Sequence, residues 1–194
     1  MISMTRSEKY GKLRSFLTDP ASLFVVEIFM IYGIWKLSHH FLLQTDWWKK
    51  LVFYIGGFYA DITNSILHVF GEHTYYHGIS ITFLDGLQRT LRVEEHCLAI
   101  PATIIFVSSI ALFGGSVKNK MWFIPLGIFC IFLINTIRLV LLSYIFENFP
   151  ETFFRVNHSF VYVVLTYSFI FLMIAWWMNS YNKPRNTPQA DNNG

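Results

Sequence analysis

Three long apolar stretches constrain the fold of this chain more than any other feature of its sequence. Residues 97–114 carry no charged side chain, residues 122–146 carry only Arg138, and residues 158–178 carry none beyond the histidine that begins them. The hydrocarbon core of a bilayer is about 30 Å thick, so a helix needs about 20 apolar residues to cross it. Residues 21–43 form a fourth such stretch. The sequence therefore predicts an all-α membrane protein with four transmembrane helices.

The composition agrees with a membrane protein and argues against several other classes. Hydrophobic residues make up 54% of the 194 residues and charged residues only 14%, compared with about 25% charged residues in an average soluble domain. Such a chain is not disordered, and its two cysteines are too few for a disulfide scaffold. The net charge of +3 is not arranged in the basic and aromatic stripes of a nucleic-acid binder, so we expect no nucleic-acid partner.

Residues 47–70 are long enough to span a membrane, but their pattern is amphipathic. Polar residues recur every three or four positions on one face, and apolar residues occupy the other. The basic residues that flank the four spans are Arg6, Lys9, Lys12, Arg14, Lys118, Lys120, Lys183 and Arg185. The positive-inside rule favours the cytoplasm for all of them, and this is possible only if residues 47–70 do not cross the bilayer. We therefore predict an outer interfacial helix that contacts the lipid bilayer. A fifth span that breaks the rule is the alternative.

The remaining segments complete a single membrane-embedded domain, residues 21–178. Residues 1–20 are a basic N-terminus and residues 179–194 a disordered polar tail, and both are predicted to be cytoplasmic. Residues 79–93 contain two short runs with β-branched residues on either side of Asp85-Gly86, which predicts a small β-hairpin. The hairpin would lead directly into Glu94-Glu95-His96-Cys97 at the outer mouth of a helix.

Three residues with chemical capability fall on the outer side of this topology, although they belong to three different helices. Cys97 opens one helix, His158 opens the last, and Arg138 lies about 12 Å below the outer end of its span at 1.5 Å per residue. An arginine inside a span costs about 2.5–3.5 kcal/mol on insertion scales and usually faces a functional cavity. Asn135 lies on the same helical face as Arg138. We expect these side chains to meet in one outer pocket.

The expected reactivity of Cys97 depends on its surroundings. A helix N-terminus, an arginine and a histidine would each lower the pKa of its thiol from about 8.5. His158 suits general acid–base catalysis, with Asn157 as the expected helix cap. Simpler interpretations stay open: an inert cysteine, an arginine that reaches the headgroups, and a histidine that only anchors its helix. Cys130 lies too deep to form a disulfide with Cys97 and is interpreted as core filler.

Other functions compete with a cysteine-based one. Histidines and acidic residues near the outer loop suggest metal or heme binding: His68, His73, His77, His96, Glu72, Glu94 and Glu95. Their spacing matches no metal-binding motif, and for heme only His39 or His40 could pair with His158. We therefore predict no metal site and no cofactor. A non-catalytic membrane assembly factor or transporter subunit is the remaining alternative.

The order of Cys97, Asn135-Thr136-Ile137-Arg138 and His158, after a hairpin-like segment, resembles the exosortase/archaeosortase family of membrane-embedded cysteine transpeptidases. The resemblance covers residues 47–178 and is strongest to the short, compact exosortases. Longer members typically continue from the cysteine as C-S-G-L-R. This chain has Leu98-Ala99-Ile100-Pro101 instead and so lacks the second arginine.

The resemblance implies an enzyme of the bacterial cytoplasmic (inner) membrane whose active site faces the exterior. Its substrates would be secreted proteins that end in a short motif, a transmembrane helix and a basic tail. It implies that Cys97 attacks the scissile bond and forms a thioester, with Arg138 and His158 completing the catalytic set. The residues expected to bind substrate or to support the catalytic set are Asn135, Glu94, Glu95 and His96.

Overall fold

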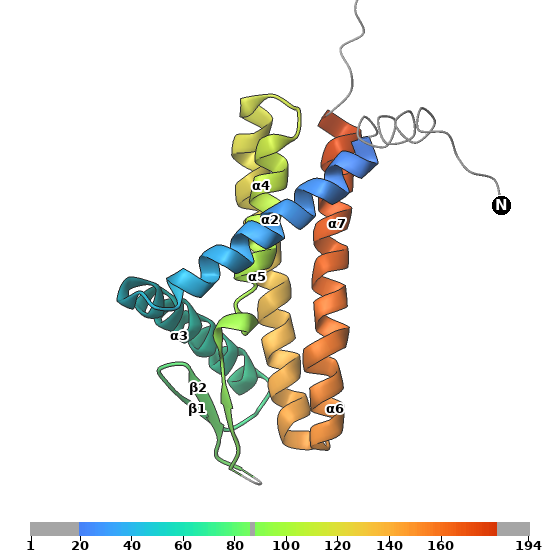
Figure 1. Ribbon diagram of the computed structural model, residues 1–194. Coiled ribbons are helices and arrows are strands. Elements are labelled where there is room, and N and C mark those ends of the chain that lie inside the picture. The colour runs from blue at the N-terminus through green and yellow to red at the C-terminus, as the bar shows by residue number, and fades with distance from the viewer. Residues whose placement is uncertain (1–19, 86–87, 182–194) are drawn as a thin grey trace, which may run out of the picture. The chain divides into compact units, whose positions relative to one another are not determined.

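The computed structural model describes residues 20–85 and 88–181, which are mostly helical (Figure 1). The chain divides into two compact units, residues 1–55 and 56–194. Helix α2 (Pro20–Leu42) lies in the first unit and is followed by a short turn and by helix α3 (Asp46–Val69), whose residues from 56 onward belong to the second unit. Almost all of the predicted cytoplasmic segments, 1–20 and 179–194, lies outside the described residues, and the single domain of residues 21–178 stays a prediction.

The second unit contains a small sheet followed by apolar helices. Strands β1 (Thr74–His77), β2 (Ser80–Phe83) and β3 (Thr90–Arg92) form an antiparallel sheet in the order β1-β2-β3. A 3-10 turn, η1, then leads into the helices, which are in chain order α4 (Ile100–Leu112), α5 (Val117–Asn148), α6 (Glu151–Val156), the π-helical turn η2 (Asn157–Val161) and α7 (Tyr162–Tyr181).

The predicted β-hairpin is confirmed as β2 and β3, with Ser80 opposite Arg92. Strand β1, which the sequence analysis did not predict, pairs with β2 so that Thr74 lies opposite Phe83. A tight turn at Gly78 connects the two strands, and this glycine has a φ of 59°. Glycine adopts that left-handed conformation without steric cost, so Gly78 is the local signal that a third strand was present.

Helix α3 contacts the sheet with part of its polar face. Asn64 is buried and accepts a hydrogen bond from the Thr74 hydroxyl at 2.8 Å, and the Nε2 atom of His68 lies 2.6 Å from the Thr74 carbonyl oxygen. On the apolar face, Phe58 and Val69 are exposed. Part of the polar stripe therefore serves tertiary contacts, not contact with water. The interfacial location of this helix stays a prediction.

Two helices in the described ranges are long and apolar enough to cross a membrane, namely Val117–Asn148 and the continuous helix Glu151–Tyr181. They contain the predicted spans 122–146 and 158–178, whereas four spans are not confirmed. The predicted span 97–114 is shorter in the structure, because α4 has only 13 residues, or about 20 Å at 1.5 Å per residue. The predicted span 21–43 corresponds to α2, which is not one of the two helices that are long and apolar enough to cross a membrane.

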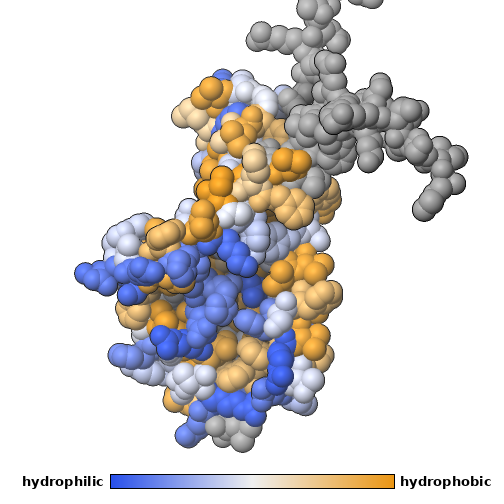
Figure 2. All heavy atoms as spheres, viewed as in Figure 1, coloured by the Kyte–Doolittle hydropathy of each residue, from blue (hydrophilic) through white to orange (hydrophobic). Residues whose placement is uncertain are grey.

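Helices α4, α5 and α7 share a buried aromatic core. Phe106, Phe123 and Trp177 are fully buried, and the Trp177 indole N–H donates to the Gly114 carbonyl at 3.1 Å. Gly127 of α5 permits this packing, because a Cβ atom there would overlap the Phe106 ring. Figure 2 shows hydrophobic residues over the surface of α7, and hydrophilic residues gathered over the strands and the segment that precedes α4. The apolar bundle thus adjoins a polar region.

Candidate active site

Cys97 lies in a 3-10 turn between the sheet and α4, not at the start of a helix as predicted. The turn η1 (Glu95–Cys97) ends three residues before α4 begins. Between them Ala99 adopts a φ of 54° and a ψ of 24°. This left-handed conformation costs a residue with a Cβ atom about 1–2 kcal/mol. In the pattern C-S-G-L-R the glycine occupies the position of Ala99, and the backbone conformation explains why glycine suits it.

Asn135 of α5 holds the backbone of Cys97 in place. Its side-chain amide donates to the Cys97 carbonyl at 2.7 Å, and Asn135 is fully buried. In a continuous helix the N–H group four residues later would bind this carbonyl, but that residue is Pro101, which has no N–H. Tyr59 of α3 also contacts Asn135: burial raises the pKa of its phenol, and the hydrogen bond with Asn135 opposes this shift. Nothing in the sequence indicated that Tyr59 would lie here.

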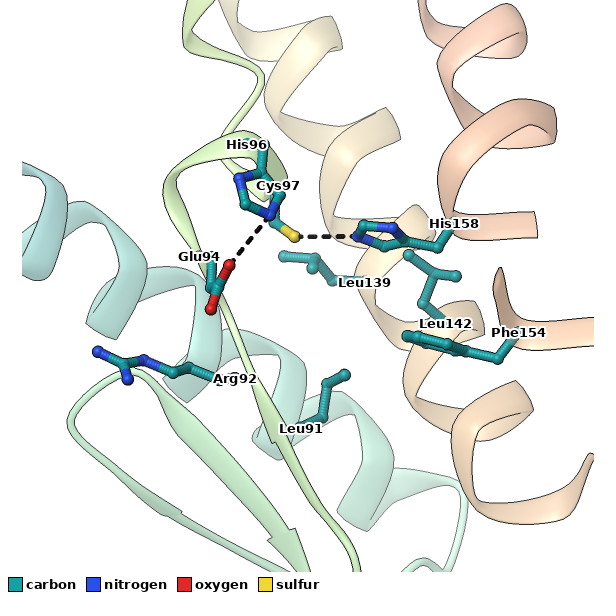
Figure 3. Close-up of a pocket in the computed structure, with 9 residues that line it drawn as sticks. All are labelled: Leu91, Arg92, Glu94, His96, Cys97, Leu139, Leu142, Phe154 and His158. Carbon is teal, nitrogen blue, oxygen red and sulfur yellow. Dashed lines mark hydrogen bonds and ion pairs between the residues drawn. The ribbon is translucent and has the colours of Figure 1, made fainter. Parts of the chain in front are cut away.

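His158 faces Cys97 across a pocket (Figure 3), and its Nε2 atom lies 3.5 Å from the Cys97 Sγ atom. The histidine does not open the last helix as predicted, because that helix begins at Glu151. Asn157 is therefore not the N-cap of the last helix, and its amide donates to a carbonyl one turn earlier at 2.9 Å. Instead, His158 belongs to the π-helical turn η2. Such turns inside helices are frequent at functional sites.

Two other rings contact the imidazole of His158. Phe154 stacks on it, with ring centroids 5.6 Å apart and an interplanar angle of 20°, and His96 contacts it edge-on at 6.2 Å. The Nε2 atom of His96 lies 3.1 Å from a carboxylate oxygen of Glu94. The structure thus brings Glu94 and His96 to the site, whereas Glu95 does not line the pocket.

Arg138 follows Asn135 by one helical turn and is 6% exposed. Its positive charge acts on the Cys97 thiol, but the predicted lowering of the pKa of Cys97 is wrong. Burial is the largest influence and raises the pKa, while the charge of Arg138 and a backbone hydrogen bond at Glu94 oppose the rise. Cys97 is also not the first residue of a helix as expected, because α4 begins three residues later.

Arg138 does not line the pocket with Cys97 and His158, contrary to the expectation that the three side chains would meet there, but its guanidinium has one donor that is unpaired among the described residues. Its Nε atom is buried and has no hydrogen-bond partner within residues 20–85 and 88–181. A buried donor left unpaired costs about 1–3 kcal/mol. A ligand oxygen that reached this atom would remove that cost, so Arg138 is suited to bind an oxygen that carries negative charge.

The pocket has a volume of about 260 Å³ and two chemically different sides, with Cys97 beside the polar residues and His158 beside the apolar ones (Figure 3). The polar side consists of three exposed residues, Arg92, Glu94 and His96. The apolar side consists of four buried or half-buried residues, Leu91, Leu139, Leu142 and Phe154. No three His, Cys, Asp or Glu side chains in the described ranges are grouped to hold a metal ion.

Two apolar helices of membrane-spanning length, with a thiol and an imidazole facing each other in a pocket, define a membrane protein with a cysteine-based candidate active site. The family model described as Transmembrane exosortase (Exosortase_EpsH) matches residues 25–177, so this chain belongs to the transmembrane exosortase family. Neither the curated proteins nor the solved structures include a significant match. The resemblance that the sequence indicated is confirmed, and the roles of individual residues stay predictions.

Proposed function

We propose that this exosortase is a cysteine transpeptidase that cleaves the C-terminal sorting signal of secreted proteins at the outer face of the bacterial inner membrane. The observation that carries the proposal is the 3.5 Å separation of the Cys97 sulfur and the His158 Nε2 atom. These residues are far apart in the sequence and lie on different elements. A thiol and an imidazole in direct contact are the minimum that nucleophilic catalysis by cysteine requires.

Burial raises the pKa of Cys97, so its resting form is the neutral thiol and a base must remove the proton during attack. His158 accepts that proton as the sulfur bonds to the scissile carbonyl carbon, and donates it to the departing amine when the C–N bond breaks. The product is a thioester on Cys97. The unpaired Nε of Arg138 supports a role in binding the oxyanion, and losing one such donor typically lowers the rate 10²–10³-fold.

Helix lengths support a site at one boundary of the bilayer. Helix α5 rises about 27 Å from Lys120 to Arg138, and the last helix about 35 Å from His158 to Tyr181, compared with a hydrocarbon thickness of about 30 Å. If Lys118 and Lys120 lie at one boundary, the site lies at the other. Basic loops favour the cytoplasm, so the site would face the exterior. The exposed apolar surface of α7 is then available to lipid and to the substrate's own helix.

The proposal is tested by co-expressing the enzyme with a reporter protein that carries a C-terminal signal of motif, apolar helix and basic tail from the same genome. We expect processing by the unaltered enzyme and its loss in Cys97→Ala, His158→Ala and Arg138→Ala at unchanged protein levels. Cys130→Ala is the matched control, because the second free cysteine lies outside the pocket. Processing by Cys97→Ala would show that the nucleophile is elsewhere.

Thiol labelling separates an enzyme from a non-catalytic membrane subunit. A membrane-impermeant maleimide added outside intact cells should label Cys97, and His158→Ala should slow that labelling because the base has been removed. In a scaffold protein the thiol would react at the same rate with or without the imidazole. A Cys97 that is labelled only after the cytoplasm is exposed would contradict the proposed orientation.

A further inference from the structure

The pocket contains a second histidine for which the proposed cleavage step has no use. His96 directly precedes Cys97, lines the same pocket and contacts the His158 ring. The carboxylate of Glu94, 3.1 Å away, bonds His96 and not the histidine that faces the sulfur. The side chains of His96 and Glu94 are 66% and 52% exposed. The pocket therefore presents one imidazole to the thiol and a second, carboxylate-paired imidazole to the solvent.

The positions of the two imidazoles suit two different half-reactions. His158 stacks on Phe154 and faces the sulfur, so it is placed for the thiol proton and the leaving amine. The second nucleophile must reach the thioester from the solvent side, because Leu139 and Leu142 close the apolar side and are each 1% exposed. His96 lies on that solvent side, and Glu94 provides a hydrogen-bond acceptor for its protonated ring.

We propose that His96, supported by Glu94, is the general base of the second half-reaction, in which an acceptor amine or water releases the protein from Cys97. The inference rests on the proposed function, because it requires the thioester. The acceptor gives its proton to the His96 imidazole as its nitrogen or oxygen bonds to the thioester carbon. The C–S bond breaks, and the electron pair leaves with the sulfur. The thiolate regains a proton from solvent through His158, and His96 returns its proton to solvent.

The second half-reaction can be isolated with p-nitrophenyl acetate, whose leaving group departs without a proton donor. The full-length enzyme in lipid nanodiscs should release a burst of nitrophenolate as Cys97 is acetylated. A slower steady release, limited by deacylation, should follow and increase when glycinamide is added as the amine acceptor. We expect His96→Gln to keep the burst and to lower the steady rate about 10²-fold or more, as expected for loss of a general base. Glu94→Gln should keep the burst and lower the steady rate by a smaller factor.

A matched control is available at a second histidine–carboxylate pair. His73 lies 3.2 Å from Asp85, its side chain is similarly exposed, and it does not line the pocket. His73→Gln should change neither the burst nor the steady rate. Free imidazole should restore the steady rate of His96→Ala, because the exposed position admits a replacement base, whereas a purely structural role would not be rescued.

The outcomes distinguish this inference from the function on which it rests. A normal steady rate in His96→Gln, or equal losses in the burst and steady phases, would show that His96 is not the base for deacylation. Absence of a burst in the unaltered enzyme, or a burst that persists in Cys97→Ala, would overturn the proposed nucleophile and the inference with it.

Discussion

Removing the hydrogen bond from Asn135 to the Cys97 carbonyl measures how strongly the position of the Cys97 backbone controls the reactivity of its thiol. Asn135→Leu keeps a side chain of similar size and removes the donor. The carbonyl then loses its 2.7 Å bond, and Pro101 has no N–H to replace it. Leaving a buried acceptor unpaired costs about 1–3 kcal/mol. The turn can avoid that cost only by moving, and the sulfur moves with it.

The expected loss of reactivity follows from this cost. If the full cost of about 1–3 kcal/mol must be overcome to bring the sulfur back to its position beside His158, acetylation of Cys97 slows about 5- to 150-fold. Each 1.4 kcal/mol corresponds to a factor of about ten in rate. The 3.5 Å sulfur–nitrogen distance leaves little room for displacement. The leucine also removes the buried Oδ1 atom of Asn135, which has no partner in the described part of the chain. The free energy of unfolding should therefore change less than the reactivity does.

The burst rate with p-nitrophenyl acetate at constant pH measures the effect. Asn148→Leu is the matched control: it lies on the same helix, and its amide donates to the Tyr144 carbonyl at 3.0 Å, but at an exposed position. Exposed substitutions of this kind rarely exceed about 0.5 kcal/mol, so the control should acetylate within about a factor of two of the unaltered enzyme. Equal rates in Asn135→Leu and Asn148→Leu would refute the argument that this bond positions the thiol.

Removing the charge of Arg138 and adding a methyl group to the tight contact at Gly127 test two other features. Arg138→Met should shift the pH midpoint of Cys97 alkylation upward, because burial raises the pKa of the thiol and the main opposing charge is removed; iodoacetamide rates over a pH series measure the midpoint, and a downward shift would contradict the assignment. Gly127→Ala should lower the thermal unfolding temperature, because the added methyl overlaps Phe106 and overpacking costs about 1–3 kcal/mol. Gly33→Ala, with open space around its Cβ, should not lower it, and equal unfolding temperatures would show that the α4–α5 contact adapts.

The sequence by itself determined the membrane character of this protein and the residues that its chemistry can use. Long uncharged stretches must avoid water whatever their tertiary contacts, so their length alone predicted the helices that contain 122–146 and 158–178. Placing an arginine inside such a stretch costs free energy of membrane insertion, so an arginine found there usually has a function. This reasoning identified Arg138 as a candidate site residue. The hairpin was also predictable, because Asp85-Gly86 between two runs with β-branched residues is a local turn signal.

Only the tertiary structure decided how these residues work together. The pKa of Cys97 depends on how closely other elements bury its sulfur. Burial raises this pKa more than the charge of Arg138, on which the sequence-based prediction relied, lowers it. The position of His158 opposite Cys97 could not be predicted from the sequence, because it depends on how two elements far apart in the chain pack together. The pairing of His96 with Glu94 also depends on the folded backbone. Side chains that are close in sequence can point in different directions, and only the structure places these two 3.1 Å apart.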